Sequence, residues 1–274
     1  MHVDVILFSA LILGGLALLS AGILFWVSKV FHVYEDPRIA LVIHELPGAN
    51  CGGCGFAGCR GLAEAMVRSA SLSGLRCPVG GTGTNTRIAT ILGVKNEATR
   101  PTIAVSRCQG SCAHAPAKSR YEGAPSCAFA ASLFAGESAC PNGCLGLGDC
   151  QNACSFNAIS INQETRLPEI NELKCVSCGA CAKNCPRLLI EMRYKDTPTG
   201  RFYVACRNTE KGAVAKKNCS VTCIGCGKCA KTCPHQAITI ENNLAYINDK
   251  KCIGCGSCLE ACPTRAIRRD MPHA

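Results

Sequence analysis

The sequence of 274 residues contains few aromatic residues, 5% of the total, and a single tryptophan, Trp26. With so little aromatic volume, a chain of this length is expected to fold around several small cores rather than one large core. The sequence also lacks a G-x-G-x-x-G segment between a strand and a helix, and it shows no nucleophile with an adjacent base. We therefore expect neither a bound dinucleotide nor an independent catalytic site.

A glycine-rich stretch at 80–93, GGTGTNTRIATILG, invites comparison with a nucleotide-binding loop. It lacks the Gly-Lys-Ser/Thr ending of such a loop, however, and it follows no clear strand. We predict a turn that leads into a helix at this point.

Cysteine, by contrast, is abundant, with 25 residues. A comparable density is typical of secreted disulfide scaffolds, but those are short and lack repeated C-x2-C spacings that end in proline. The spacings here indicate thiolate ligands for metal clusters instead. Because such thiolates must stay reduced, we expect the cysteine-bearing part of the chain to face the cytoplasm.

The C-terminal region contains two copies of the spacing C-x2-C-x2-C-x3-C-P, in CIGCGKCAKTCPHQAI and CIGCGSCLEACPTRAI. In such runs the first three thiolates bind one 4Fe-4S cluster, and the fourth binds the partner cluster. The two loops must therefore fold together as a two-cluster ferredoxin module. The predicted ligand sets are Cys223, Cys226, Cys229 with Cys262, and Cys252, Cys255, Cys258 with Cys233.

A similar pair of loops precedes this one. Its first loop reads as a stretched version, C-x3-C-x5-C-x3-C, with Ser155 where proline is usual, whereas its second loop is regular and ends in Pro186. Between the loops of each module, the segments AISINQETRLPEI and AITIENNLAYI alternate apolar and polar residues and predict hairpins. The exchange rule predicts the ligand sets Cys140, Cys144, Cys150 with Cys185, and Cys175, Cys178, Cys181 with Cys154.

A third type of site lies nearer the N-terminus, in PGANCGGCGFAGC. Its spacing is C-x2-C-x4-C-x17-C, through Cys51, Cys54, Cys59 and Cys77. The glycines let the backbone wrap tightly and point amides at sulfur. A structural zinc ion would accept the same four thiolates and is the alternative here. The neighbouring ferredoxin loops favour a cluster, and residues 60–69 are predicted to be helical.

These assignments give five clusters on twenty cysteines. The remaining five are expected to be packed free thiols, because cysteine is commonly buried as a small hydrophobe, and a sixth cluster built from some of them is the alternative. They are Cys108, Cys112, Cys127, Cys206 and Cys219.

The formal net charge is +10. An oxidised 4Fe-4S core held by four thiolates carries about −2, so five clusters would bring roughly −10 and cancel this charge. A basic docking face for an acidic redox partner is the alternative. A scaffold that binds nucleic acid is disfavoured, because basic and aromatic residues are not interleaved and an apolar segment precedes the cysteines.

That apolar segment runs from Val5 to Val27 without a charge, and as a helix it would reach roughly 35 Å, enough to cross a bilayer. A cleaved signal peptide is the competing interpretation, but no basic residues precede the run, and it is longer than an ordinary signal core. Lys29 and Arg38 follow it, so the positive-inside rule places the C-terminal bulk in the cytoplasm.

We therefore predict an α+β protein in which an N-terminal transmembrane helix is followed by a small Gly/Cys-rich 4Fe-4S domain and two tandem bacterial-type ferredoxin modules. The predicted units are a transmembrane anchor (1–28), the 4Fe-4S domain (29–95), a connecting segment (96–138), module 1 (139–194), a linker (195–216) and module 2 (217–274).

With the anchor, the CGGCGFAGC site and the block GCLGLGDCQNAC in this order, the chain resembles the B subunit of the Rnf complex, a membrane-bound, ion-translocating ferredoxin:NAD oxidoreductase. The segments PTIAVSRCQG, YEGAPSC and LLIEMRY also look like this family, and the resemblance covers essentially the whole chain. Ser155 and Cys112 depart from the expected pattern. Since Ser155 is not a ligand, it affects the rigidity of its loop rather than the cluster.

The resemblance implies that soluble reduced ferredoxin delivers electrons to this subunit, which passes them to membrane-embedded partner subunits. Other subunits would reduce NAD and move Na+ or H+ across the cell inner (cytoplasmic) membrane. The residues alone lead to a membrane-anchored polyferredoxin, and a feeder of another membrane oxidoreductase, such as a hydrogenase-type complex, remains an alternative. Because the Cys51–Cys77 site follows the apolar segment closely, we expect it to lie nearest the bilayer, and module 2 to meet the donor.

Overall fold

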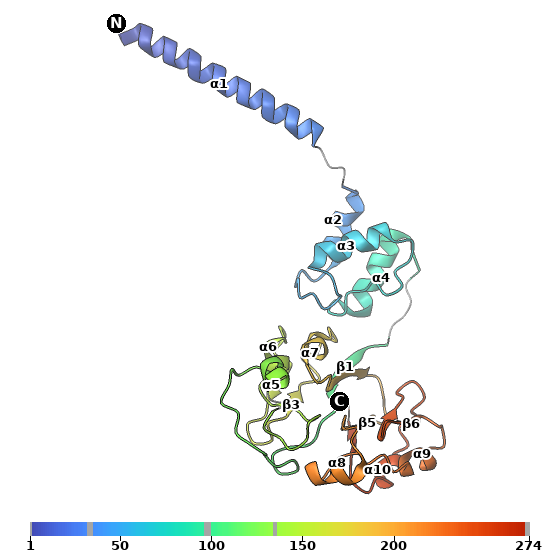
Figure 1. Ribbon diagram of the computed structural model, residues 1–274. Helices are drawn as coiled ribbons and strands as arrows, with labels where there is room; N and C mark the ends of the chain where they lie inside the picture. The colour runs from blue at the N-terminus through green and yellow to red at the C-terminus, as the bar shows by residue number, and fades with distance from the viewer. Residues whose placement is uncertain (1, 32–34, 96–99, 134–135, 272–274) are drawn as a thin grey trace.

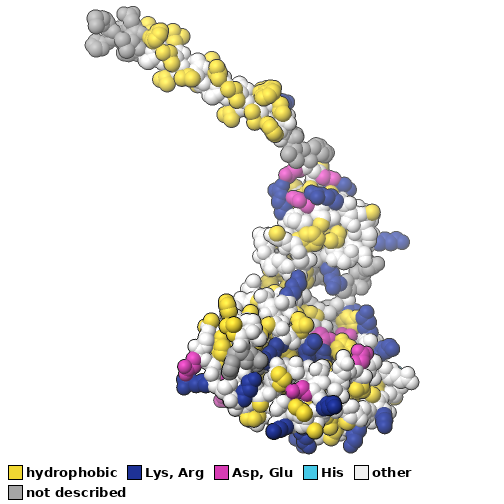
Figure 2. All heavy atoms as spheres, in the orientation of Figure 1, with side chains coloured by type: hydrophobic (Ala, Val, Ile, Leu, Met, Phe, Trp, Pro, Cys, Tyr) yellow, Lys and Arg dark blue, Asp and Glu magenta, His cyan; other side chains and the backbone are white. Residues whose placement is uncertain are grey.

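In the computed structural model, residues 2–31, 35–95, 100–133 and 136–271 are described. Helix α1 (His2–Val30) stands apart from the rest of the chain in Figure 1. Its segment Leu7–Val30 is long and apolar enough to cross a membrane, and none of its most apolar window is buried against protein. The hydrophobic side chains along this helix are visible as yellow spheres in Figure 2. The predicted apolar helix is therefore present.

Three helices form the small domain that follows: α2 (Pro37–Glu45), α3 (Cys59–Arg68) and α4 (Gly81–Leu92). Helix α2 begins where a capping residue is expected, since the carboxylate of Asp36 accepts a hydrogen bond from the amide of Arg38 at 2.9 Å. The helices enclose a core of buried apolar side chains, namely Val42, Leu46, Leu62, Ala63, Met66, Leu72, Ile88 and Ala89. The predicted helices at 60–69 and within 80–93 are confirmed as α3 and α4.

Module 1 contains two small antiparallel sheets. The hairpin predicted between its loops is confirmed as β2 (Ile159–Ile161) paired with β3 (Pro168–Ile170). The second sheet pairs β4 (Ile190–Tyr194) with β1 (Thr102–Ser106), a strand that lies in the segment predicted to connect the domains. Short helices complete the module: α5 (Cys127–Leu133), α6 (Asp149–Asn152) and α7 (Ala180–Asn184).

Module 2 repeats this plan. Its predicted hairpin is confirmed as β6 (Ile238–Glu241) paired with β7 (Leu244–Ile247), and β8 (Ile267–Asp270) pairs with β5 (Arg201–Val204) from the predicted linker. Three short helices lie beside the loops, α8 (Gly212–Asn218), α9 (Lys228–Thr232) and α10 (Ser257–Glu260). Both segments predicted as connections therefore supply an edge strand to the module that follows them. The boundary predicted at residue 96 falls in 96–99, outside the described residues.

The two modules pack directly against each other, as Figure 1 shows for the strands β1 and β5. Val105 of β1, Tyr203 of β5 and the adjacent Ala205 form a buried apolar contact. Arg201 and Glu172, 6% and 4% exposed, form a two-bonded ion pair across the interface, with both N–O distances 3.0 Å. Helices and separate antiparallel sheets on these cores make the protein α+β, as predicted.

Candidate iron-sulfur sites

Module 2 gathers its eight loop cysteines around two small cavities. One cavity is lined by Cys223, Cys226, Cys229 and Cys262, and the other by Cys233, Cys252, Cys255 and Cys258. These are the two sets that the exchange rule predicts, with the fourth thiol of each loop in the cavity of the other loop. Four soft thiols around each apolar cavity are a donor set that fits a 4Fe-4S cluster.

Burial shapes the acidity of these thiols. It raises the pKa of Cys229 to about 11, and charges at Cys223 and Cys262 add to the rise. It raises the pKa of Cys258 to about 12, with further contributions from Cys252 and Cys229. The thiolates that a cluster requires are therefore formed only as the metal binds, so cluster assembly releases protons.

All four ferredoxin loops share one backbone conformation before their third cysteine. In each loop the residues four and two positions before that cysteine have positive φ angles, which turn the chain around the site; they are Gly146 and Gly148, Ser177 and Gly179, Gly225 and Gly227, and Gly254 and Gly256. The third cysteine then enters a short helix and is buried in every case; these residues are Cys150, Cys181, Cys229 and Cys258. This pattern gives the register of each loop independently of the cysteine spacing.

The fourth cysteines are equally alike. Each sulfur atom accepts a hydrogen bond from the amide four residues later, at 3.3 to 3.4 Å; the sulfur atoms belong to Cys154, Cys185, Cys233 and Cys262. Amide hydrogen bonds to a ligating sulfur stabilise its negative charge and tune the potential of a bound cluster. Ser155 does not disturb this arrangement, because Cys154 makes the same bond as the three cysteines that precede a proline.

The first loop of module 1 fits this register in an unexpected way. In the other three loops the first and second cysteines stand six and three residues before the third. Counted back from Cys150 in the same way, Cys144 takes the place of the first cysteine, and Leu147 takes the place of the second. Burial raises the pKa of Cys150 to about 11, and charges at Cys127 and Cys185 add to the rise. Cys127, at the start of α5, therefore lies beside this loop, which the spacing alone does not reveal.

Cys140, by contrast, packs elsewhere. It lies in a buried apolar cluster with Ala115 and Cys219, with Val221 against it. Cys150, Cys154, Cys175 and Cys181 lie in another cluster, the core of module 1. The structure thus brings together the predicted set of Cys154, Cys175, Cys178 and Cys181, since burial raises the pKa of Cys178 with contributions from Cys154 and Cys175.

The glycine-rich site lies at one edge of the helical domain. Burial raises the pKa of Cys77, and charges at Cys59 and Cys54 add to the rise, so these predicted ligands are neighbours. The amide of Gly80 donates a hydrogen bond to the sulfur of Cys77 at 3.3 Å. Asn50 holds the start of α3 by accepting a hydrogen bond from the amide of Cys59 at 2.9 Å. A side chain at position 58, where φ is +146°, would collide with Asn50.

This site touches module 1 directly. A Cβ atom placed on Gly53 would lie 2.6 Å from the Cβ atom of Cys178, so only glycine allows the two loops to approach so closely. The charge of Cys51 also contributes to the raised pKa of Cys178, after burial. The Cys51–Cys77 site is therefore adjacent to the site of Cys154, Cys175, Cys178 and Cys181.

At the glycine-rich site the alternative to a cluster is a single zinc ion, whose four thiolates, at Zn–S distances of about 2.3 Å, would lie about 3.8 Å apart. A 4Fe-4S cube carries its thiolates on four separate irons and needs a wider set. Among the described residues, no three His, Cys, Asp or Glu side chains come close enough to hold one ion.

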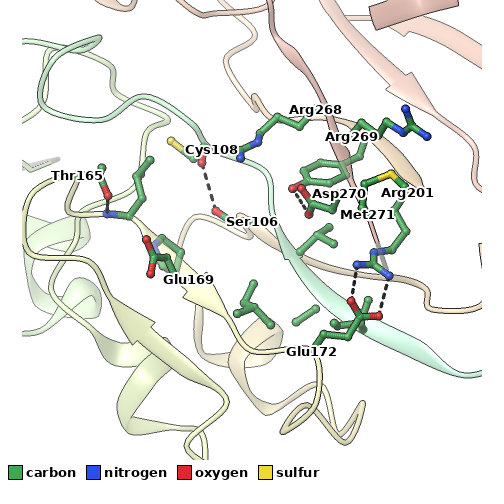
Figure 3. Close-up of a pocket in the computed structure, with 17 residues that line it drawn as sticks. Ser106, Cys108, Thr165, Glu169, Glu172, Arg201, Arg268, Arg269, Asp270 and Met271 are labelled. Carbon is green, nitrogen blue, oxygen red and sulfur yellow. Dashed lines mark hydrogen bonds and ion pairs between the residues drawn. The ribbon is translucent and has the colours of Figure 1, made fainter. Parts of the chain in front are cut away.

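A cavity of about 520 Å³ lies between the two modules (Figure 3). Residues of β1, β3, β5 and β8 line it, and the ion pair of Arg201 with Glu172 closes one side. Cys108 is the one cysteine among its lining residues, and its carbonyl oxygen accepts a hydrogen bond from Ser106 at 3.3 Å. A single thiol does not make a cluster site, so the cavity itself is not one of the four-thiol sites.

Family models match most of the cysteine-rich chain. A "4Fe-4S dicluster domain" model matches residues 137–189 and 222–266, and a second model with the same description matches 174–237. A model described as "Putative Fe-S cluster" matches 46–78, which is the glycine-rich site. The protein therefore binds 4Fe-4S clusters.

Curated relatives resemble the chain over most of its length. It is 43% identical, over 82% of its residues, to the B subunit of the Na(+)-translocating ferredoxin:NAD(+) oxidoreductase complex of Acetobacterium woodii, of which it covers 66%. It is 39% identical over 90% of its length to the B subunit of the ion-translocating oxidoreductase complex of Methanosarcina acetivorans, covering 92% of that protein. The B subunit of the proton-translocating ferredoxin:NAD(+) oxidoreductase complex of Clostridium ljungdahlii is 37% identical, with 82% and 78% of the two chains covered.

These relatives are subunits of membrane complexes, and the exposed apolar helix α1 fits the same setting, so the protein is membrane-anchored. The anchor, the glycine-rich cluster site and the two ferredoxin modules occur here in one chain. The chain therefore belongs to the family of iron-sulfur B subunits of the ion-translocating Rnf oxidoreductase complexes.

Proposed function

We propose that this subunit accepts electrons from reduced soluble ferredoxin at module 2 and passes them through its cluster sites to membrane partners. Those partners couple NAD reduction to the translocation of Na+ or H+. The observation that carries the proposal is that thiol sites occur in both modules and that the glycine-rich site, in the domain that follows α1, lies directly against module 1. Bound 4Fe-4S clusters supply the one-electron chemistry, and no bond-making residue is needed in this chain.

The exposed end is module 2. Cys226 and Cys255 are exposed, whereas the other cysteines of these two loops are buried or half-buried. Exposed lysines surround the same loops, namely Lys228, Lys231, Lys250 and Lys251, and Figure 2 shows dark blue side chains along this lower end of the molecule. An acidic electron donor would be attracted to this surface, and charge complementarity speeds such encounters.

The other end is the glycine-rich site. Its loop approaches the Cys178 loop at Gly53, and its domain follows α1 in the chain. We assign Cys51, Cys54, Cys59 and Cys77 to the cluster that hands electrons on to the membrane subunits. Lys29 and Arg38 on the C-terminal side of the apolar helix support a location of the modules on the cytoplasmic side of the inner membrane.

We further propose that each module includes the strand that precedes its loops. Module 1 would then begin at β1 and module 2 at β5, because each strand pairs with the last strand of its own module. The segments predicted as a connection and a linker are on this view parts of the modules.

Replacing Cys59 by Ser tests the direction of transfer. In membranes that contain the whole complex, reduced ferredoxin should still bleach the visible absorbance of the module 2 clusters, but NAD reduction should stop. Cys112→Ser, which alters an exposed cysteine outside the predicted sets, is the matched control and should leave both signals unchanged. Undiminished NAD reduction in the Cys59→Ser protein would refute the assigned exit.

A further inference from the structure

Four cysteines that stand outside the register of the ferredoxin loops meet between the two modules. Cys108 follows β1, Cys206 follows β5, Cys140 precedes the first loop of module 1, and Cys219 precedes the first loop of module 2. Cys140, Cys206 and Cys219 are 6%, 8% and 6% exposed. The cysteine spacing leaves three of the four as free thiols, so their convergence is a result of the fold.

Shared neighbouring residues connect the four cysteines. A Cβ atom on Gly110 would lie 3.1 Å from the sulfur of Cys219 and 3.9 Å from that of Cys108, so these two sulfurs face the same point. Cys219 and Cys140 share the buried cluster around Ala115.

Asn208 links the other pair. Its side chain is fully buried, and its Nδ2 atom lies 3.8 Å from the sulfur of Cys140. The backbone amide of Asn208 donates a hydrogen bond to the sulfur of Cys206 at 3.4 Å. Every member of the group is thus connected to another through one intervening residue.

The two modules supply these cysteines in equivalent ways. Cys108 and Cys206 each stand two residues after the end of the first strand of their module. Cys140 and Cys219 each stand four residues before the first loop cysteine, in the segments CPNGC and CSVTC. Because β1 and β5 pack side by side, the two halves face each other. The side chain of Arg107, next to Cys108, connects the two halves, because it donates a hydrogen bond to the carbonyl oxygen of Cys206 at 3.4 Å.

The surroundings suit charged sulfur ligands. The amide of Cys144 donates to the sulfur of Cys108 at 3.3 Å, and the hydroxyl of Thr222 lies 3.4 Å from the sulfur of Cys206. Hydrogen-bond donors around ligating sulfurs are the usual outer partners of iron-sulfur clusters. Burial raises the pKa of Cys140 to about 11, and charges at Cys108 and Cys206 add to the rise. Three of the four thiols are buried, Cys108 is half-buried, and none of them forms a disulfide, so a cation is needed to hold them as thiolates.

The loop register explains why Cys140 is free for this site. In the first loop of module 1, Leu147 occupies the position of the second cysteine. Cys127 lies at this loop, because its neighbours Ser126 and Ala128 both donate hydrogen bonds to Asp149 at 3.0 Å. That loop can therefore complete a four-thiol set with Cys127 and Cys185, without Cys140.

We propose that Cys108, Cys140, Cys206 and Cys219 bind a sixth 4Fe-4S cluster between the modules, and that Cys127 completes the set of Cys144, Cys150 and Cys185. This inference deepens the proposed electron-transfer function and rests on it. It uses 24 of the 25 cysteines in six sets of four, and the one left over, Cys112, is exposed.

The inter-module site, Cys108, Cys140, Cys206 and Cys219, lies next to a cysteine loop of each module. On one side, the backbone amide of Cys144 donates to the sulfur of Cys108 at 3.3 Å, so the first loop of module 1 is adjacent. On the other side, Cys206 and Cys223 lie in one buried cluster, so the first loop of module 2 is adjacent as well. The six sites then follow one another without a gap, from the exposed thiols of module 2 to the glycine-rich site.

The test is a metal count on full-length protein, purified without oxygen in detergent. Iron, sulfide and zinc are measured per chain in the wild type, in the double variant Cys206→Ala/Cys219→Ala and in the control Cys112→Ala. We expect about 24 irons in the wild type and the control, and about 20 in the double variant, at four irons per cluster. Mössbauer spectra should lose one sixth of their cluster intensity in the double variant, and the zinc content should stay negligible throughout.

About 20 irons in the wild type, unchanged in the double variant, would overturn the inter-module cluster, and so would one zinc that disappears in the double variant. The wild-type count decides the question even where the double variant fails to fold. A wild type without iron would instead refute the proposed electron-transfer function, so the two failures are distinguishable.

Discussion

Module 1 and module 2 share one backbone plan but differ in how completely their loops supply thiols. Both loops of module 2 carry four cysteines each, and both sets line cavities of their own. The first loop of module 1 has the same positive φ angles and the same amide bond to its fourth cysteine, yet Leu147 stands at its second ligand position. A shared backbone shape thus does not require that every ligand come from the loop itself.

In module 1, hydrogen bonds to the first loop hold the long segment between β1 and that loop in place. Helix α5 packs beside the first loop, and Asp149 accepts a hydrogen bond from the hydroxyl of Ser126 at 3.0 Å and another from the amide of Ala128 at 3.0 Å. These bonds fix the start of α5 where Cys127 meets the loop. Module 2 has complete loops, and its counterpart segment between β5 and the first loop, which contains α8, is far shorter and supplies no thiol to those loops.

The largest effect is expected from changing which residue supplies the missing thiol to the first loop of module 1. Cys127→Ala should remove one cluster from module 1, about four of the irons, because the first loop alone offers only part of a set. Adding Leu147→Cys to the same protein should restore those irons, since position 147 has the place in the loop that Cys226 has in module 2. Iron content and Mössbauer intensity of the full-length protein measure both changes.

Cys112→Ala serves as the control for a cysteine outside the sets, and it should lose no iron. If Cys127→Ala keeps all its iron, the loop is complete without α5, and the proposed difference between the modules disappears.

The regular loops and hairpins of both modules could be predicted from the sequence, because residues close together in the chain determine them. The C-x2-C spacings and the alternation in the two hairpin segments depend on neighbouring residues, and β2–β3 and β6–β7 form as expected. The segment TIAV is strand-like in its residues, but its partner β4 lies about ninety residues further along, and nothing local encodes that pairing. The packing of β1 against β5, and with it the meeting of Cys108 and Cys206, is of the same non-local kind.

The register of the first loop of module 1 does have a signal in the sequence. A glycine stands two residues before the third cysteine in all four loops; these are Gly148, Gly179, Gly227 and Gly256. Aligning on that glycine places Leu147 at the second ligand position, whereas aligning on the cysteines alone makes Cys140 the first. The repeated C-x3-C step at Cys140 and Cys219 is a second signal. Spacing alone does not show that these steps face each other across an interface.

A smaller effect is expected at the interface that joins the modules. Glu172→Gln leaves the guanidinium of Arg201 buried without its opposite charge, which typically costs about 3–5 kcal/mol. Asp196→Asn is the matched change in an exposed pair, with Arg100, where both side chains are 47% exposed, and it should cost at most about 1 kcal/mol. Urea unfolding followed by circular dichroism and by cluster absorbance measures both.

If the two modules form one unit, both probes should shift together in the Glu172→Gln protein. Equal, small shifts in the two variants would show that the buried pair contributes little and that the modules are stable separately.

The smallest effect should come from the contact between module 1 and the glycine-rich site. Cys178 lies under Gly53, whereas its counterpart in module 2, Cys255, is exposed. Gly53→Ala would push the two loops apart and should cost about 1–3 kcal/mol in overpacking, because backbone rather than a flexible side chain stands in the way. It should also weaken the magnetic coupling between the reduced clusters of the two loops, measured by EPR.

Gly61→Ala in helix α3 is the control, because its new Cβ atom would meet only an ordinary contact at 3.7 Å. It should leave that coupling unchanged and slightly stabilise the helix. An unaltered EPR spectrum in the Gly53→Ala protein would mean that the two modules do not differ in their contact with this domain in solution.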